Sequence, residues 1–579
     1  MKSAQRGMQK YSVRESAPDG VRAELISYPE FLQDMLYTRG ILSRDAAEVF
    51  LAPDYTRDLH DPFLMRNMAR AVSRILGALQ AEERIAIYSD YDCDGIPGGV
   101  LLHDFFKKIG YTHFTNYIPH RHEEGYGFHA GAVEELALCG TTLIITVDCG
   151  TNDTAAAFRA KELGVEVIVV DHHLPSENPA QVYALLNPKQ VGETYPFKLL
   201  CGSGVAFKLV QGLLAEGSAS WRIHKGWEKW LLDMAGLGTL ADMVPLTGEN
   251  RALAYFGLAV LKKSPRLGLM KLCRLMRVVQ REFTEDDAYF MLVPRINAAS
   301  RMDAPMEAFR LLTTEEETVA ASSAAHLNRI NDERKGVVAS MVKEIRKRVT
   351  DRPLGSVVVA GDPRWKPSLL GLAANTLAEE YERPVFLWGR EGTMLLKGSC
   401  RSGGSVSVFQ LMESRRELFI EFGGHQFAGG FSVAYENVHL LELQLSESFL
   451  SLQTMSLAPE KTAFDRELSL EDVNWNTYRH IARLAPFGEG NPKPLWLFRN
   501  ALIENVRLFG KEKQHLELSF ARQKGKAVSA IKFFAEPNDF DTPIAVGASV
   551  DLLATIERST FRNFPELRLR IVALVTPEV

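Results

Sequence analysis

The chain has 579 residues, of which 46% are apolar and 24% are charged, and its net charge is −5. A chain of this length is expected to fold into roughly three or four globular domains. The acidic balance excludes attraction of a polyanion by net charge, so any nucleic-acid binding must be local. No apolar run of about 18 residues and no secretory signal is found, which predicts a cytoplasmic protein without membrane spans. The six scattered cysteines predict free thiols.

The predicted elements begin with two short capped helices at 30–36 and 43–50. From residue 84 apolar strands alternate with amphipathic helices. We expect strands at 84–89, 112–118, 142–147 and 165–170, and helices at 130–138 and 153–163. This alternation predicts an α/β fold with a doubly wound, mainly parallel sheet, whose ligand sites lie at the carboxyl ends of the strands.

Acidic and imidazole side chains follow several of these strands. Any one of them has an ordinary explanation: a solvated Asp-rich turn, a helix cap, or a structural histidine pair. It is improbable that all of these residues, at one edge of the sheet, serve only as caps. Unpaired carboxylates repel one another unless a cation lies between them. The candidate metal ligands are Asp90, Asp92, Asp94, Asp148, His172 and Asp242, and His173 follows His172 in the chain.

This set also indicates which metal it would bind. Carboxylate oxygens with an imidazole and no thiolate suit Mn²⁺ or Mg²⁺ rather than a structural zinc. Five or six such ligands suffice for two ions bridged by one aspartate, which activate water and clamp a phosphoryl group. The sequence therefore predicts phosphoester hydrolysis.

The order of these motifs resembles a known family. Asp90-Tyr-Asp-Cys-Asp-Gly, Val147-Asp148, Asp171-His-His173 and Gly238-Thr-Leu-Ala-Asp242 look like the four motifs of the DHH phosphoesterase superfamily. Within it the chain is similar to the bacterial RecJ single-stranded-DNA exonucleases from about residue 30 onward. Further matching stretches include Pro294-Arg-Ile-Asn-Ala-Ala-Ser-Arg-Met302 and Phe422-Gly-Gly-His-Gln-Phe-Ala-Gly-Gly430.

The resemblance implies a role for each residue. Asp148 would bridge two ions, Asp90 would be a ligand or support one, and His173 would contact the scissile phosphate or protonate the leaving oxygen. Substrate contacts are implied for Arg121, Tyr126, Arg301, Ser399, Arg401 and His425.

The rest of the chain divides by pattern and by resemblance. We expect an N-terminal extension at 1–60, a DHH catalytic domain at 61–262 and a helical connector at 263–350. A second, smaller α/β domain of the DHHA1 type follows at 351–457, with helices at 367–381 and 406–422. Short alternating strands then predict a β-barrel at 458–579, which the resemblance implies is an OB-fold that tracks a single strand.

The expected function is metal-dependent hydrolysis of single-stranded DNA in repair and recombination. The resemblance implies 5′-to-3′ polarity, release of mononucleotides, a monomer, and a single-strand-binding protein and a RecQ-type helicase as partners. Two alternatives stay open: a phosphodiesterase for short oligonucleotides or cyclic dinucleotides, and an inactive replication scaffold. Five residues depart from the family's usual pattern and indicate a divergent member: Pro97, Ser300, Lys366, Asn375 and Thr376.

Overall fold

The structure is a computed structural model. It describes residues 11–350, 354–390, 395–404, 406–453, 462–510, 513–540, 542–559 and 565–577, without the side chains of 218–220. The chain divides into two compact units. One comprises residues 61–242 and 256–459, and the other comprises 1–60, 243–255 and 460–579. The predicted domain boundaries after residues 350 and 457 fall outside the described residues.

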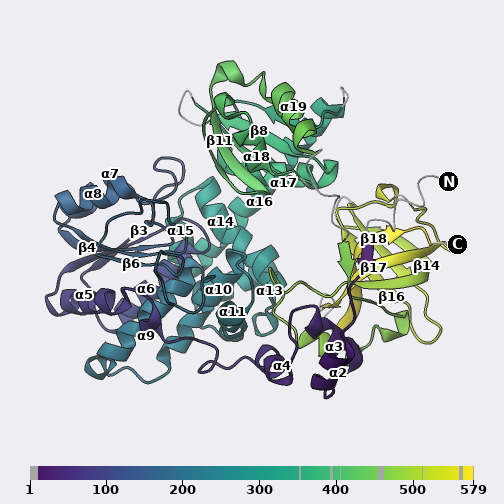
Figure 1. Cartoon of the computed structure of the whole chain (residues 1–579), viewed down its shortest axis with the longest axis horizontal. Coiled ribbons are helices and arrows are strands. Elements are labelled where there is room, and N and C mark those ends of the chain that lie inside the picture. Colours follow the sequence, from purple (N-terminus) through teal and green to yellow (C-terminus); the bar gives the residue numbers. More distant parts are fainter. Residues whose placement is uncertain are drawn as a thin grey trace. The chain divides into compact units, whose positions relative to one another are not determined.

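A five-stranded parallel sheet organises the first unit (Figure 1). Its order is β3 (Phe114–Tyr117), β2 (Arg84–Ser89), β4 (Thr141–Val147), β5 (Glu166–Val170) and β6 (Ala184–Leu186). The strands β2, β4 and β5 are almost continuously buried, as expected of strands covered on both faces. The predicted doubly wound α/β fold is confirmed, although the short β6 was not foreseen.

Helices cover both faces of this sheet. Figure 1 shows α7 (Ala130–Leu138) and α8 (Thr154–Glu162) on one side, with α5 (Met68–Gln80), α6 (Gly95–Lys108) and α9 (Gly202–Trp221) on the other. Buried residues of α7 and α8, such as Val133 and Ala156, join one core cluster with Ala86 and Ile144 of the sheet. These layers leave the carboxyl ends of the strands free to carry a site.

A helical region continues this unit. It contains α10 (Leu232–Ala241), α11 (Gly248–Leu261), α12 (Leu267–Met276), α14 (Val293–Met302), α15 (Met306–Thr313) and the long α16 (Glu317–Thr350). The first residues of α11 belong to the second unit. The expected connector helix is present as α16, which contacts α12, α14 and α15.

The second α/β domain contains a mixed sheet. Its order is β10 (Phe419–Gly424), β11 (Ala428–Val433), β9 (Leu396–Arg401), β8 (Val385–Arg390) and β7 (Val358–Gly361), and only β7 and β8 run parallel. The helix α17 (Pro367–Tyr381) has the predicted bounds. The predicted helix at 406–422 is wrong. Helix α18 (Val408–Glu413) is short, and residues 419–424 pair with β11 as a hairpin.

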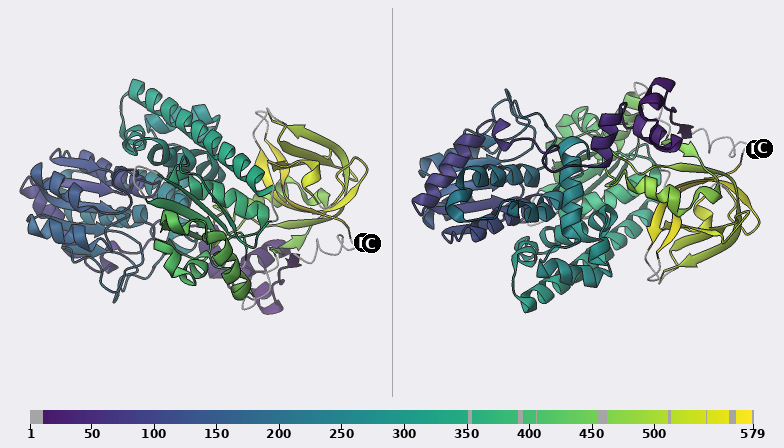
Figure 2. Two further views of the ribbon diagram at one scale, coloured as in Figure 1. Left: turned by 90° about the horizontal axis from the view of Figure 1, so that it is seen from above. Right: turned by 90° about the horizontal axis from the view of Figure 1, so that it is seen from below.

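The other unit contains a closed five-stranded barrel. Figure 2 shows its strands curving round. The strands β14 (Trp496–Phe509), β15 (His515–Phe520), β16 (Val528–Phe533), β18 (Glu566–Val575) and β17 (Ser549–Ser559) follow one another, and β17 pairs back with β14.

The N-terminal segment packs against this barrel. Helices α3 (Glu30–Tyr37) and α4 (Arg44–Leu51) have almost the predicted bounds. Leu32 and Leu36 of α3 share a core cluster with Trp496 and Phe498 of the barrel. The strand β1 (Tyr11–Val13) pairs in parallel with β12 (Thr462–Phe464). Residues near the two ends of the sequence therefore form one core.

Candidate metal centre

Three neighbouring parallel strands end at the same edge of the sheet and carry the acidic motifs. The strand β2 leads into Asp90, Asp92 and Asp94, β4 leads into Asp148, and β5 leads into 171–173. The backbone continues the ladder at these positions, because Asp90 N–H donates to Val147 O at 3.0 Å. The edge predicted from the strand pattern is therefore where these side chains meet.

Asp94 is held by the amino end of α9. Its Oδ2 accepts the N–H of Gly202 at 2.6 Å, and its Oδ1 accepts the N–H of Ser203 at 2.8 Å. Ser203 Oγ also donates to Asp94 O at 2.6 Å. The first turn of a helix has free N–H groups and a partial positive charge, which stabilise a buried carboxylate. This contact fixes Asp94 before any ligand binds.

Asp148 has an unusual backbone at the centre of the cluster. Its φ of 62° lies in the left-handed region, which few residues other than glycine adopt. Its N–H donates to Val170 O, and its Oδ1 lies 3.1 Å from His172 Nε2. A Cβ added at Gly202 would lie 2.6 Å from Asp148 Cβ, so this glycine permits the close approach. Strain of this kind is concentrated at functional sites.

The side chains form three overlapping groups whose candidate ligand atoms lie within 4.8 Å of one another. One group contains Asp90, Asp92 and Asp148, and a second contains Asp94, His172 and Asp242. The third contains Asp148, His172 and His173. All six predicted metal ligands are therefore together, and Asp148 belongs to two groups, which is the place expected for a bridging carboxylate.

The donor atoms of this cluster fit a divalent cation. Asp90 Oδ1, Asp148 Oδ1 and His172 Nδ1 are buried and accept or donate no hydrogen bond within the described residues. Burial, and then neighbouring aspartates, raise the pKa of Asp90 and of Asp148 well above the usual range. Burial lowers the pKa of His172 to about 4, which keeps its imidazole neutral. Oxygen ligands with a neutral imidazole suit Mn²⁺ or Mg²⁺.

Asp242 completes the cluster from a different element. It ends α10, and its Oδ2 lies 3.6 Å from His172 Nε2. Burial, and then the charges of Asp94 and Asp92, raise the pKa of Asp242 to about 8. A carboxyl with this pKa binds a cation only by releasing a proton near neutral pH.

His173 is oriented by Asp171, which is fully buried. Asp171 Oδ1 lies 2.8 Å from His173 Nδ1 and also accepts the N–H of His172 at 2.7 Å. Burial lowers the pKa of His173, but the hydrogen bond to Asp171 and the charges of Asp171, Asp242 and Asp94 together raise it more, so the net shift is upward. The hydroxyl of Tyr126 lies 3.1 Å from His173 Nε2. The predicted residues His173 and Tyr126 thus adjoin the cluster.

Two predicted arginines lie beside the same cluster. The guanidinium of Arg121 lies 4.8 Å from the ring centre of Tyr91. Burial, and then the charge of Arg121, lower the pKa of Arg301 to about 10. Within the described residues neither arginine forms an ion pair with a carboxylate, although the charge of Asp92 acts on both. A phosphate would satisfy both.

The remaining predicted substrate contacts lie in the mixed sheet. Ser399 and Arg401 lie on β9, and His425 lies in the turn between β10 and β11, as the glycine pattern predicted. Arg301 Nη1 donates to Ser368 O on α17 at 2.7 Å. A Cβ added at Gly371, one turn further along α17, would lie 2.9 Å from Arg401 Nη2. The amino end of α17 therefore lies between a connector arginine and a DHHA1-domain arginine.

Three supporting residues were not assigned a role from the sequence. Asp171 orients His173, Ser203 holds Asp94, and Asn297 Oδ1 accepts the N–H of Cys93 at 2.9 Å. All three lie in stretches that match the family motifs, but a pattern of letters does not show which atoms meet.

The five departures from the family pattern have local partners or caps. Pro97 lies in the first turn of α6, where its missing N–H costs nothing, and Lys366 is the N-cap of α17. Ser300 Oγ donates to Asn297 O, Asn375 to Glu379 and Thr376 to Leu372 O.

The fold and this site define a phosphoesterase of the DHH class. The DHH family N-terminal domain matches residues 84–239, the DHHA1 domain matches 354–449, and the RecJ OB domain matches 464–573. The single-stranded-DNA-specific exonuclease RecJ of Bacillus subtilis is 33% identical over 569 residues, covering 97% of this chain and 70% of that protein.

Solved structures agree with these sequence comparisons. RecJ from Thermus thermophilus in complex with Mn²⁺ matches with a TM-score of 0.80 and 26% identity, covering 98% of this chain and 80% of that chain. The same protein in complex with Mg²⁺ matches with a TM-score of 0.74. The chain belongs to the RecJ family.

Proposed function

We propose that this chain is a metal-dependent exonuclease that hydrolyses phosphodiester bonds of single-stranded DNA in repair and recombination. The observation that carries this proposal is the overlap of three ligand groups through Asp148 and His172. Relatives at 33% and 31% identity are named as single-stranded-DNA-specific exonucleases, and the matched structures contain Mn²⁺ or Mg²⁺.

The residues divide the chemical work. Asp90, Asp92 and Asp148 would hold one cation, and Asp94, His172 and Asp242 would hold the other. Asp148 also lies in one group with His172, which makes it the candidate for a shared ligand. Such a pair of ions supplies Lewis acidity and lowers the pKa of a bound water. His173, with Nδ1 fixed by Asp171, presents its other nitrogen beside Tyr126, where it protonates the leaving oxygen or contacts the phosphate.

Substrate binding follows from the charges next to this cluster. Arg121 and Arg301 bind backbone phosphates, because their guanidinium groups lack carboxylate partners within the described residues. Ser399, Arg401 and His425 extend this contact from the second α/β domain, and the barrel binds another part of the strand. We further infer 5′-to-3′ polarity and mononucleotide products, with catalysis by residues 61–262.

A digestion experiment tests the proposal. Single strands labelled at one end, with each terminus blocked in turn, are incubated with the full chain and Mn²⁺. Loss of degradation only when the 5′ end is blocked supports the polarity. Loss only when the 3′ end is blocked would show the opposite polarity.

Asp148→Asn should lower turnover more than about 100-fold, which exceeds the loss typical of changes outside the ligand set. The exposed Asp45→Asn is the matched control.

Two other functions predict different results in this assay. A phosphodiesterase for short substrates would hydrolyse dinucleotides faster than long strands, which the barrel domain argues against. A scaffold would bind strands and cleave none, although it gains nothing from buried carboxylates that repel one another.

The partners and cellular setting also belong to this proposal. We infer a cytoplasmic monomer that works with a single-strand-binding protein and a RecQ-type helicase, on the strength of the family resemblance. Among the described residues, no helix is both long and apolar enough to span a membrane. Pull-down of the purified chain with each candidate partner, and sedimentation of the chain alone, test these assignments.

A further inference from the structure

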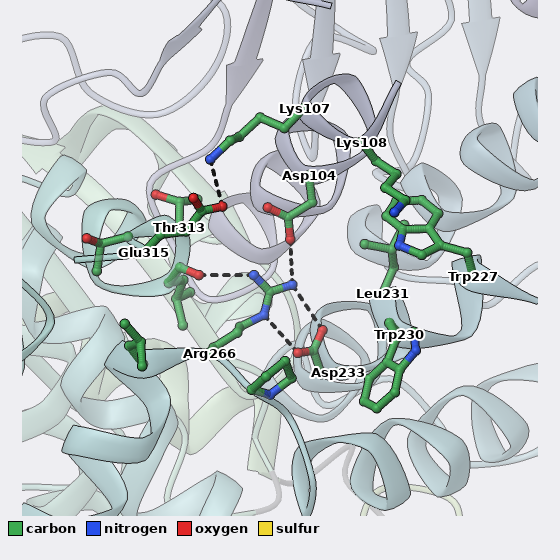
Figure 3. Close-up of a pocket in the computed structure, with 14 residues that line it drawn as sticks. Asp104, Lys107, Lys108, Trp227, Trp230, Leu231, Asp233, Arg266, Thr313 and Glu315 are labelled. Carbon is green, nitrogen blue, oxygen red and sulfur yellow. Dashed lines mark hydrogen bonds and ion pairs between the residues drawn. The ribbon is translucent and has the colours of Figure 1, made fainter. Parts of the chain in front are cut away.

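A second cavity lies away from the metal centre, at the carboxyl end of α6 (Figure 3). Its volume is about 660 Å³, within the range of small-molecule sites. Trp227 and Trp230 form one wall, and Lys107 and Glu315 lie opposite them. Nothing in the proposed reaction uses these side chains.

The floor of the cavity is a closed polar network. Arg266 donates to Asp233 Oδ2 at 2.8 Å, to Leu312 O at 3.0 Å and to Asp104 Oδ2 at 2.7 Å. Ser264 Oγ also donates to Asp233 at 2.7 Å. Since the guanidinium already has its partners, the floor shapes the cavity rather than supplying a free charge. A metal ion is disfavoured because Arg266 already occupies both carboxylates.

The walls combine aromatic faces with lysine cations. The ammonium of Lys108 lies 5.7 Å from the ring centre of Trp227, and that of Lys263 lies 5.5 Å from Trp230. The side chain of Trp230 is half exposed. Lys107 pairs with Glu315 at 3.0 Å, but both are exposed, so exchange of this carboxylate for another anion costs little.

We propose that this cavity binds a nucleotide, with the base against the tryptophan wall and the phosphate at Lys108. Indole rings stack on any base, and a lysine ammonium binds phosphate as a point charge. Glu315 and the threonine at 313 offer acceptors for the exocyclic amines of a base. An acidic peptide would bring several carboxylates against Glu315, Asp104 and Asp233, whereas a nucleotide carries its charge at one end, beside Lys108.

The cavity is distinct from the metal centre but joined to it by two helices. Helix α6 starts directly after Asp94, and its 14 residues place Lys108 about 20 Å away. Helix α10 runs the other way, from Asp233 at the cavity to Asp242 at the metal centre. That a nucleotide is available as a ligand rests on the proposed function, since the reaction releases one.

The test is a binding titration of the full chain in EDTA, where the metal centre cannot retain a phosphate through bound ions. The probes are 5′-dAMP, a nuclease-resistant hexanucleotide, inorganic phosphate and an acidic peptide. We expect saturable binding of 5′-dAMP, weakened about tenfold or more by Trp230→Leu and by Lys108→Ala. Trp475→Leu, an exposed tryptophan on α20 (Trp475–Ala482), is the matched control.

The arms of this experiment separate the outcomes. If only the hexanucleotide binds, and Trp230→Leu abolishes this binding, the cavity recognises nucleotides and its ligand is a DNA strand. Binding of the acidic peptide in place of both nucleotide probes overturns the proposal, as does equal affinity of Trp230→Leu and Trp475→Leu. Digestion of labelled strands with Mn²⁺ is measured separately, so failure of this site and failure of the exonuclease assignment are distinguishable.

Discussion

Asp171 Oδ1 lies 2.8 Å from His173 Nδ1, and the same oxygen accepts the backbone N–H of His173 at 3.2 Å. Asp171 Oδ2 accepts the N–H of Thr151 at 3.0 Å. Burial alone would raise the pKa of Asp171, but the contacts with His173, Thr151 and His172 together lower it below the ordinary range. The carboxylate therefore stays ionised and fixes which nitrogen of His173 faces away from it.

Asp171→Asn should lower kcat about 10- to 100-fold, because an amide no longer holds the imidazole by charge. Mn²⁺ binding should change much less, since Asp171 is absent from the three ligand groups. Turnover on a labelled single strand and metal titration by calorimetry measure the two effects. Asp153→Asn is the control, because Asp153 bonds the N–H of Phe128 instead. Equal losses of kcat in both variants would contradict an orienting role for Asp171.

Gly238→Ala should damage the metal centre from the side of α10. The added Cβ would lie 2.2 Å from Ser203 Oγ and 2.6 Å from Asp94 Oδ1, so the carboxylate must move. We expect weaker Mn²⁺ binding and at least about a tenfold loss of turnover, since a misplaced ligand affects both. The measurements are metal titration and the digestion assay.

Gly336→Ala is the matched control for this substitution. Gly336 lies in the interior of α16, and a Cβ there would meet nothing within 4 Å. This change should stabilise the protein by about 1 kcal/mol without altering activity, because alanine favours a helix more than glycine does. Normal activity in Gly238→Ala would show that the cluster tolerates displacement of Asp94.

The sequence was sufficient for the elements and residues whose signals are local. The strands β2, β4 and β5 are buried apolar runs, and the side chains after them meet because parallel strands end at one edge. The predicted helix at 406–422 failed because Val408, Leu411 and Met412 have helical spacing, whereas Phe419 and Phe422 belong to a strand that pairs with β11 in a hairpin. Propensity gives way to tertiary contacts there.

The packing of the N-terminal segment on the barrel could not be predicted in the same way. The helices α3 and α4 have clear caps and spacing, but nothing in their residues names a partner in a distant part of the chain. Arg39 illustrates this contact, since its Nε donates to Asn491 Oδ1 at 2.7 Å. The supporting roles of Ser203 and Asn297 could not be predicted for the same reason, because each contacts a residue far away in the chain.

Leu36→Ala tests whether the N-terminal helices and the barrel share one core. Leu36 is fully buried in the cluster that contains Trp496 and Phe498. Removing its side chain should cost about 2 to 5 kcal/mol and should increase hydrogen exchange in β14 as well as in α3. Hydrogen exchange followed by mass spectrometry locates the effect. Leu42→Ala, at an exposed position, should change stability by less than about 0.5 kcal/mol. Unchanged exchange in β14 would contradict a shared core.

The barrel should lose stability in acid through Glu557. Burial raises the pKa of this carboxyl, but the charges and hydrogen bonds of Arg570 and Arg568 on the paired strand lower it more, to below its usual value. A carboxyl whose folded pKa is lowered contributes stability above its unfolded pKa, about 4.3, and loses it as the pH falls through the folded pKa.

Glu557→Gln should therefore reduce the stability of the barrel by about 1 to 3 kcal/mol at pH 7. The same change should flatten the decline of stability below about pH 5. Hydrogen exchange in β17 and β18 at about pH 7, 5 and 4 measures both changes, with the exposed Glu504→Gln as control. Parallel pH dependence in Glu557→Gln and the parent chain would show that this ion pair does not govern the acid response.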